Sequence, residues 1–314
     1  MQVNALMLMS SLILMSVQTP MLRAAGEDAP GIIYVEQPVR IELAAYAKTW
    51  PALEPYVARL AKQETTGVTA DLQHAAGMAD PSDGALNLLS QLHRRDGKFD
   101  QAESLIDRAI AIDSKQHLHH FQRAMIFYAR LQKASGRLER WGWHSKTKDA
   151  YRRAFELEPG ALPYRYYLAY TYLQEPWIAG GNKDEALRLA QQGLDMGQKE
   201  FLVVLADVHR LRGDIALAFT TYDTSIRSGV FKLNSYLGAG HLALEQKDFE
   251  RARRYFEYAV RCRPDSPKTH EGLGDYHAAL HDTQAAAQAY QMALQQDPNN
   301  SLARQKLGKI KRNP

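Results

Sequence analysis

Histidine is the residue type whose number and spacing first suggest chemistry in this sequence. Of the 11 histidines, His277 and His281 are four residues apart, which would place both imidazoles on one face of a helix, where they could share a metal ion. His117, His119 and His120 form a second group. Neither group is accompanied by an HExxH motif or by a carboxylate–histidine triad. We therefore expect packed or solvated histidines, with no bound metal and no cofactor.

Nucleophilic catalysis has one candidate, Cys262, which is the single cysteine of the chain. The neighbouring Arg263 could lower the pKa of this thiol, but a lone thiol between helices is more often structural. The sequence has no G-x-S-x-G nucleophile motif and no GxxxxGK(S/T) phosphate-binding loop. We therefore predict that the protein is not an enzyme.

The composition excludes several broad classes of protein. Apolar residues make up 45% of the chain and charged residues 24%, which is ordinary for a folded chain and excludes wholesale disorder. Lysine and arginine number 39 against 35 acidic residues, giving a net charge of +4. This excess is too small to indicate nucleic acid as a partner. One cysteine also rules out an intramolecular disulfide.

The N-terminal residues differ from the rest of the chain. Residues 5–18 form an uncharged apolar run, shorter than the ~20 residues that a membrane-spanning helix needs. Ala24-Ala25-Gly26 follows, with small residues suited to signal-peptidase cleavage, although no lysine or arginine precedes the run. We predict a signal peptide at 1–26, export to a bacterial periplasm, and no stable membrane span after cleavage. The alternative is an uncleaved N-terminal anchor.

A 34-residue period organises most of the chain. The clearest copy has Leu273-Gly274 on a first helix and, on a second, Ala286, Tyr290 and Ala293, followed by Pro298. One period earlier the same positions hold, in order, Ala239-Gly240, Ala252, Phe256, Ala259 and Pro264. Small residues at fixed positions let two helices cross closely, and the aromatic residue fills the gap to the next pair.

This order of large, small, aromatic and small residues ending in proline resembles the tetratricopeptide-repeat (TPR) family of helix–turn–helix units. The resemblance implies an all-α, right-handed superhelical solenoid with an N-terminal helical cap region at 27–82 and a C-terminal capping helix at 301–314. It indicates six units, at 83–116, 117–161, 162–198, 199–232, 233–266 and 267–300. Inserts are expected between the two helices of the second unit, at 136–146, and of the third unit, at 175–181.

In TPR folds the first helix of each unit lines an inner groove that takes an extended peptide or a partner's helix. Tyrosine suits such a groove because it has both an apolar ring and a hydroxyl; the alternative is that the rings pack between neighbouring units. Helical phase gives these candidate partner-binding residues: Phe121, Met125, Tyr128, Tyr166, Tyr167, Tyr170, Asp207, Arg210 and His241. The lysine and asparagine pattern with which some TPR units grip acidic C-termini is absent, because the matching positions hold residues such as Gln91 and Asp207.

These patterns favour a non-enzymatic scaffold or adaptor in the bacterial cell envelope. It would bind a protein or peptide partner of unknown identity through the aromatic-rich groove, and nucleic acid is not an expected partner. The alternative is a periplasmic small-molecule or lipid-binding TPR component of a transport system, with Trp141, Trp143 and Trp177 enclosing the ligand.

Overall fold

The computed structural model describes residues 43–312, with gaps at 135, 175–180 and 299. Within these residues it contains α-helices, one short 3-10 helix and no β-strand, which confirms the predicted all-α class. The predicted signal peptide at 1–26 and the cap region as far as residue 42 lie outside the described residues.

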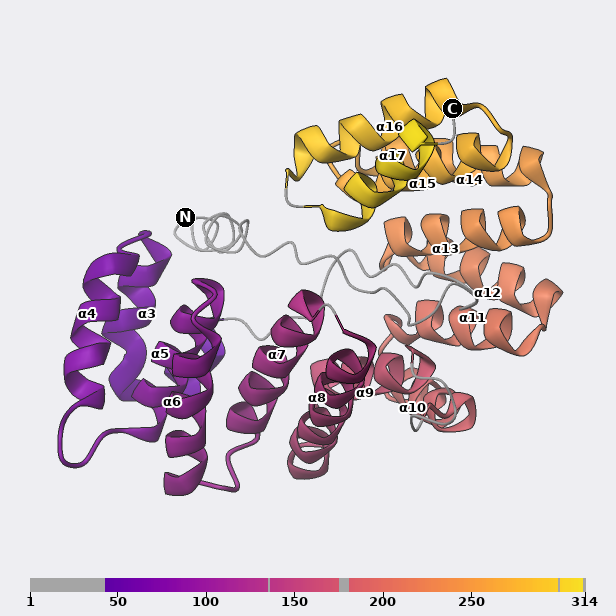
Figure 1. Ribbon diagram of the computed structural model, residues 1–314. Coiled ribbons are helices and arrows are strands. Elements are labelled where there is room, and N and C mark those ends of the chain that lie inside the picture. The colour runs from indigo at the N-terminus through magenta and orange to yellow at the C-terminus, as the bar shows by residue number, and fades with distance from the viewer. Residues whose placement is uncertain (1–42, 135, 175–180, 299, 313–314) are drawn as a thin grey trace, which may run out of the picture. The chain divides into compact units, whose positions relative to one another are not determined.

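The chain divides into two compact units, and each is described by itself (Figure 1). Unit 1 covers described residues 43–171 and contains α2 (Leu43–Thr49), η1 (Pro51–Leu53), α3 (Glu54–Ala61), α4 (Thr65–Ala76), α5 (Asp83–Arg95), α6 (Phe99–Ile112), α7 (His117–Lys133), α8 (Arg137–Leu157) and most of α9 (Leu162–Gln174). Unit 2 covers residues 172–312 and contains α10 (Lys183–Asp195), α11 (Phe201–Arg212), α12 (Ile215–Ser228), α13 (Lys232–Glu245), α14 (Phe249–Cys262), α15 (Pro267–Ala279), α16 (Thr283–Gln296) and α17 (Ser301–Arg312).

Packing within each unit joins helices that are neighbours in the sequence. In unit 1, α4 packs on α5, α5 on α6, α6 on α7 and α7 on α8, and the first helices α5 and α7 also touch each other. In unit 2 the same order holds from α10 to α17, and the first helices α11, α13 and α15 touch in turn. This nearest-neighbour arrangement is the packing of a repeat solenoid.

The small and aromatic residues of the 34-residue period meet in the core of unit 2. A Cβ atom added at Gly274 would come within 2.5 Å of the ring of Tyr290, and one at Gly240 within 2.8 Å of the ring of Phe256. Ala252 and Ala286 are completely buried. The repeated pattern therefore reflects helix crossings so close that a larger side chain does not fit.

Residues 136–146 do not form the insert that the sequence predicts between two helices. Instead, Arg137–Leu157 is one continuous helix of 21 residues, α8. The segment lacks proline and is rich in helix-forming Leu, Glu, Arg and Lys, and Trp143 packs against Phe127 of α7 with ring centroids 5.8 Å apart. The extra residues lengthen a helix pair and leave Leu138 80% exposed and Trp141 47% exposed. Most of the second insert, at 175–180, lies outside the described residues.

The turns between paired helices share a left-handed backbone position. Gly97 and Gly213 have φ values of +76° and +88°, which glycine adopts without strain. One period after Gly213, Lys247 has φ +57°, and one further period on, His281 has φ +60°. A Cβ atom is unfavourable in this conformation, so two of these turns carry backbone strain.

Replacing Lys247 or His281 with glycine should raise the free energy of unfolding by about 1 kcal/mol each, because the strain disappears. Both side chains are exposed, so few contacts are lost. Urea or thermal unfolding followed by circular dichroism measures the gain. Lys247→Ala is the control, because it removes the side chain but keeps the Cβ; an equal gain in that variant would exclude backbone strain as the cause.

Candidate binding site

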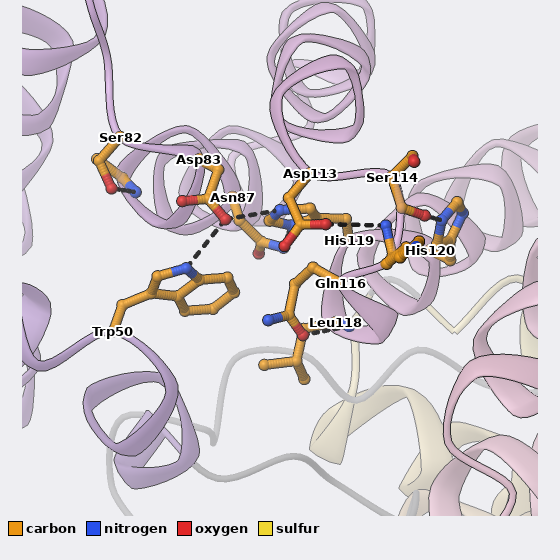
Figure 2. Close-up of polar contacts among 12 residues, drawn as sticks. Trp50, Ser82, Asp83, Asn87, Asp113, Ser114, Gln116, Leu118, His119 and His120 are labelled. Atoms are coloured by element: carbon orange, nitrogen blue, oxygen red, sulfur yellow. Dashed lines mark hydrogen bonds and ion pairs between the residues drawn. The ribbon is translucent and has the colours of Figure 1, made fainter.

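A polar network joins the N-terminal helices of unit 1 to the first helices α5 and α7 (Figure 2). Trp50 Nε1 donates to Asp83 Oδ2 at 3.0 Å, and His119 Nε2 lies 3.1 Å from the same oxygen. Asn87 Nδ2 donates to His119 Nδ1 at 2.8 Å. Because Nδ1 accepts this bond, the ring carries its proton on Nε2 and donates it to Asp83. The network therefore connects Trp50, beside the cap helices, with α5 and α7.

The geometry of this network is that of a structural connection. The indole of Trp50 stacks on the imidazole of His119 with centroids 5.5 Å apart, and Gly84 lets the indole approach α5, since a Cβ there would lie 2.5 Å from the ring. Burial lowers the pKa of His119, with Asp83 opposing that shift. The neutral imidazole has both nitrogens engaged, so it is not poised to transfer a proton.

On the same face of α5 as Asn87 lies Arg94, an arginine without a partner among the described residues. Asn87, Gln91 and Arg94 are spaced by four and three residues, so their side chains share one helix face. Arg94 is half-buried. Its Nε is buried, and no residue in the described part of the chain accepts a hydrogen bond from it or forms an ion pair with it. The side-chain oxygen of Gln91 is also buried without a described partner.

Three buried tyrosines lie within electrostatic range of Arg94. Its charge interacts with the hydroxyl groups of Tyr46, Tyr151 and Tyr167, three residues that are all at most 2% exposed. Burial raises the pKa of Tyr46 to about 12, and the positive charge of Arg94 opposes this rise. The phenols therefore remain protonated at neutral pH and can act as hydrogen-bond donors.

The rings beneath this site form a rigid stack. Tyr151 and Tyr167 are nearly parallel, at 8°, with centroids 5.2 Å apart. The ring of Phe121 lies 5.9 Å and 6.0 Å from these two rings. The hydroxyl of Tyr151 donates to the sulfur of Met125 at 3.3 Å, and the buried hydroxyl of Tyr128 has no partner within the described residues. We call Gln91, Arg94, Met125 and Tyr128, together with Tyr46, Tyr151 and Tyr167, the Arg94 site.

The structure brings the six candidate residues of unit 1 into one region. Tyr166 lies 5.9 Å from Tyr167 and 4.9 Å from Tyr170 between ring centroids, and Tyr167 in turn contacts Phe121. The five aromatic members are between 0% and 7% exposed, whereas Met125 is partly exposed. The rings pack against one another, and their role in partner binding stays a prediction.

The three candidate residues of unit 2 are buried and form polar contacts inside that unit. Asp207 accepts a hydrogen bond of 2.5 Å from the hydroxyl of Tyr222. Arg210 Nη1 donates to Glu245 at 3.1 Å. These side chains are therefore engaged by other residues of unit 2.

His241 belongs to a second polar group of unit 2. Its Nε2 lies 3.9 Å from Asp275 Oδ2, and its ring meets the ring of Phe256 edge-on at 5.1 Å. Asp275 also accepts hydrogen bonds from Tyr290 at 2.7 Å and from Lys306 at 2.6 Å. Burial lowers the pKa of His241 to about 3; Lys306 and Arg210 add to the shift, and Asp275 opposes it.

Residues 237–301 match the sequence model of the family described as tetratricopeptide repeat. A solved tetratricopeptide repeat protein from Parabacteroides merdae superposes with a TM-score of 0.69 at 17% identity, covering 86% of this chain and all of the other. The fold is that of a TPR solenoid.

Two further solved structures share this TPR fold. Yeast Tom70 matches with a TM-score of 0.53 at 13% identity, covering 87% of this chain and 62% of that one. PilW, a type IV pilus biogenesis factor, matches with a TM-score of 0.52 at 15% identity, covering 73% and 97%. A sequence comparison with curated proteins finds no match. The TPR fold typically serves as a non-enzymatic scaffold and commonly mediates protein–protein interaction.

His277, His281 and Cys262 all belong to unit 2. His277 Nδ1 lies 3.7 Å from Asp282, and His281 is exposed in a turn; within the described ranges, no three His, Cys, Asp or Glu side chains are grouped as a metal site. Cys262 is a partly exposed thiol at the end of α14. Over the same ranges, every helix is too short or too polar to cross a membrane.

A cavity of about 420 Å³ lies between α6, α7 and α8. Its lining is largely charged, with residues of both signs: Glu103, His120, Arg123, Phe127, Lys146, Asp149, Ala150 and Arg153. Trp143 has Lys146 and Arg130 over its ring at 4.6 Å and 4.9 Å, and Trp177 lies outside the described residues.

Tyr170→Ala should lower the free energy of unfolding of unit 1 by about 3–5 kcal/mol, because it empties the place of a buried ring. Tyr170→Phe keeps the ring and should cost far less. Thermal and urea unfolding of the full chain measures both. If Tyr170→Ala unfolds like the unchanged protein, the ring does not support the core.

Acid should destabilise unit 2 through His241. The unfolded imidazole has a pKa near 6.5, whereas the buried one stays neutral down to about pH 3. Between these values the unfolded chain binds an extra proton, so stability is complete above pH 6.5 and falls as the pH falls. The loss from this residue at pH 5 is about 2 kcal/mol.

Comparing unfolding free energies at pH 7 and pH 5 tests this effect. His241→Gln should show a smaller loss than the unchanged protein. His281→Gln, at an exposed histidine, serves as the control and should leave the loss unaltered. An equal pH dependence in all three proteins would contradict a buried neutral His241.

Proposed function

We propose that this chain is a scaffold without catalytic activity that binds an extended segment of a protein partner at the Arg94 site. One observation carries the proposal: the guanidinium of Arg94 and the hydroxyl of Tyr128 lack partners among the described residues, beside the partly exposed side chain of Met125. Unsatisfied polar groups next to an apolar contact are suited to an extended peptide, whose backbone and side chains supply both kinds of partner.

The aromatic residues have different proposed roles in this arrangement. Phe121, Tyr128, Tyr166, Tyr167 and Tyr170 are buried, so they would hold the helices in place while the partly exposed Met125 meets the partner. Rigid rings keep the contacting groups fixed before binding, which reduces the entropy lost in the complex. The candidates of unit 2 would contribute through the stability of that unit, because their polar groups already contact one another.

The proposed location is the bacterial cell envelope. The support is the apolar run at 5–18 followed by Ala24-Ala25-Gly26, the order of a cleaved export signal. The fold is compatible with envelope assembly, since PilW, which shares it, is a type IV pilus biogenesis factor.

Site-specific crosslinking tests the proposed surface. A benzophenone amino acid in place of Met125 should give a protein adduct in cells, identified by mass spectrometry, whereas the same group at Ile112 should not. Ile112 is the matched control because it is an exposed apolar residue, 53% accessible, on the second helix α6. Protein adducts at Ile112 alone would contradict the proposed binding surface at Met125. Lipid adducts at Met125 would favour a lipid carrier.

With the captured partner in hand, Met125→Ala should weaken binding by about 1–3 kcal/mol, as expected for a central apolar contact. Ile112→Ala should change binding by less than about 0.5 kcal/mol, as for a residue outside the interface. Isothermal titration calorimetry measures both affinities. The proposal fails if Ile112→Ala weakens binding and Met125→Ala does not.

A further inference from the structure

We infer that the Arg94 site takes a carboxylate of the bound segment, which pairs with the guanidinium of Arg94. This inference rests on the proposed function and names the chemistry that the partner brings to the site. It starts from a difference between Arg94 and the arginines around it. Arg95 pairs with Asp96 at 3.7 Å, Arg123 with Asp107 at 2.7 Å, and Arg130 with Glu103 at 3.0 Å.

Arg94 has no such carboxylate within the described residues, although it is half-buried. A guanidinium whose Nε is removed from water without a counter-charge is unfavourable, because the hydration that this atom has lost is not replaced. Arginine stays protonated at physiological pH, so the group cannot avoid this cost by losing its proton. A bound anion would replace the lost hydration with charge-assisted hydrogen bonds.

The surroundings favour an anion over any other ligand group. The hydroxyls of Tyr46, Tyr151 and Tyr167 lie within electrostatic range of the guanidinium, and burial raises the pKa of Tyr151 well above its ordinary value. These phenols are therefore uncharged and do not compensate the positive charge of Arg94. The Tyr128 hydroxyl is a further donor without a partner among the described residues. The Tyr151 hydroxyl already donates to Met125. The donors without a described partner are thus Arg94 and the Tyr128 hydroxyl, and donors beside a cation suit an acceptor with negative charge.

The count of charges favours a carboxylate over a phosphate. Arg95, the other cation that acts on Arg94, has its own carboxylate in Asp96. Of these two neighbouring cations, Arg94 is therefore the one without a carboxylate among the described residues. A carboxylate carries one negative charge and matches the planar guanidinium with two parallel hydrogen bonds, whereas a phosphate monoester carries nearly two charges at neutral pH.

This site differs from the lysine and asparagine pattern of other TPR grooves. It consists of one guanidinium among phenols, and the amide beside it, Gln91, is unpartnered because the first pair has no aromatic hydroxyl to reach it. Ile106 stands in that pair at the position that Tyr151 occupies in the next pair. The Gln91 amide is thus also available to the bound segment.

The first test uses small probes on the full chain. The Nε–H resonance of Arg94, assigned by its loss in Arg94→Gln, is followed in ¹⁵N-arginine-labelled protein during titration with propionate and with propionamide. The inference expects a saturable shift with propionate and none with propionamide. No shift with propionate, or equal shifts with both, overturns it.

The second test uses matched pools of random nine-residue peptides. Every peptide is acetylated at its N-terminus. Two pools are amidated at the C-terminus and differ only in having Asp or Asn at the central position. The third pool has Asn at the centre and a free C-terminal carboxylate. Fluorescence anisotropy should show at least about tenfold tighter binding of one carboxylate-bearing pool over the amidated Asn pool, as for a charge-assisted hydrogen-bonded pair. The carboxylate-bearing pool that binds more tightly shows whether the site prefers a side-chain carboxylate or a C-terminal one.

Variants separate this inference from the proposed function. Arg94→Gln should remove the preference without lowering the melting temperature, since it breaks no ion pair, and Arg95→Gln should keep the preference. If all pools bind equally and Met125→Glu abolishes that binding, the carboxylate inference is overturned, whereas the proposed peptide-binding surface is retained. No binding by any pool would overturn the peptide surface, and the propionate titration would still decide whether Arg94 takes a carboxylate.

Discussion

One contact sets the spacing of the helices in unit 2: an aromatic ring of a second helix lies directly on the backbone of first helices. The ring of Phe256 would collide with a Cβ at Gly240, in its own pair, and at Gly272, in the next pair. The rings of Tyr222 and Tyr290 lie in the same way on Gly238 and Gly274. Because each ring is wedged against glycine, the helices approach to a fixed distance, and this distance decides which side chains of the first helices remain at the surface.

Whether this ring carries a hydroxyl group then determines which type of residue lies opposite it on the first helix. The hydroxyls of Tyr222 and Tyr290 donate to Asp207 and Asp275, whereas Phe256, which has no hydroxyl, meets the ring of His241. In unit 1 the hydroxyl of Tyr151 reaches only the sulfur of Met125, a weak acceptor. The charged groups of unit 2 are thus engaged by its own framework, while unit 1 keeps an apolar side chain at the equivalent position.

The sequence predicts the repeated framework well because the framework depends on local spacing. The 34-residue period places glycine, alanine and aromatic residues at the observed contacts, since a helix crossing needs small residues at fixed phase. Two features depend on long-range packing and were not predictable. Residues 136–146 extend α8 because Trp143 packs on Phe127, and Tyr166 and Tyr170 are buried although helical phase places them toward a groove. Arg94 was missed because its lack of a carboxylate among the described residues depends on how the helices pack.

The same physics that makes Asp207 and Arg210 poor contacts makes Arg94 a good one. A charge that is paired inside its own unit gains little from a partner, because the existing pair must first be broken. A half-buried charge without a pair gains the full interaction, since its hydration is already reduced in the free protein. Local departures from full pairing are expected where a protein meets a ligand. In this chain the arginine without a described pair belongs to the same site as the partly exposed Met125, above a stack of packed rings. The affinity of unit 1 for a partner would therefore come from groups that are held in position before the partner binds.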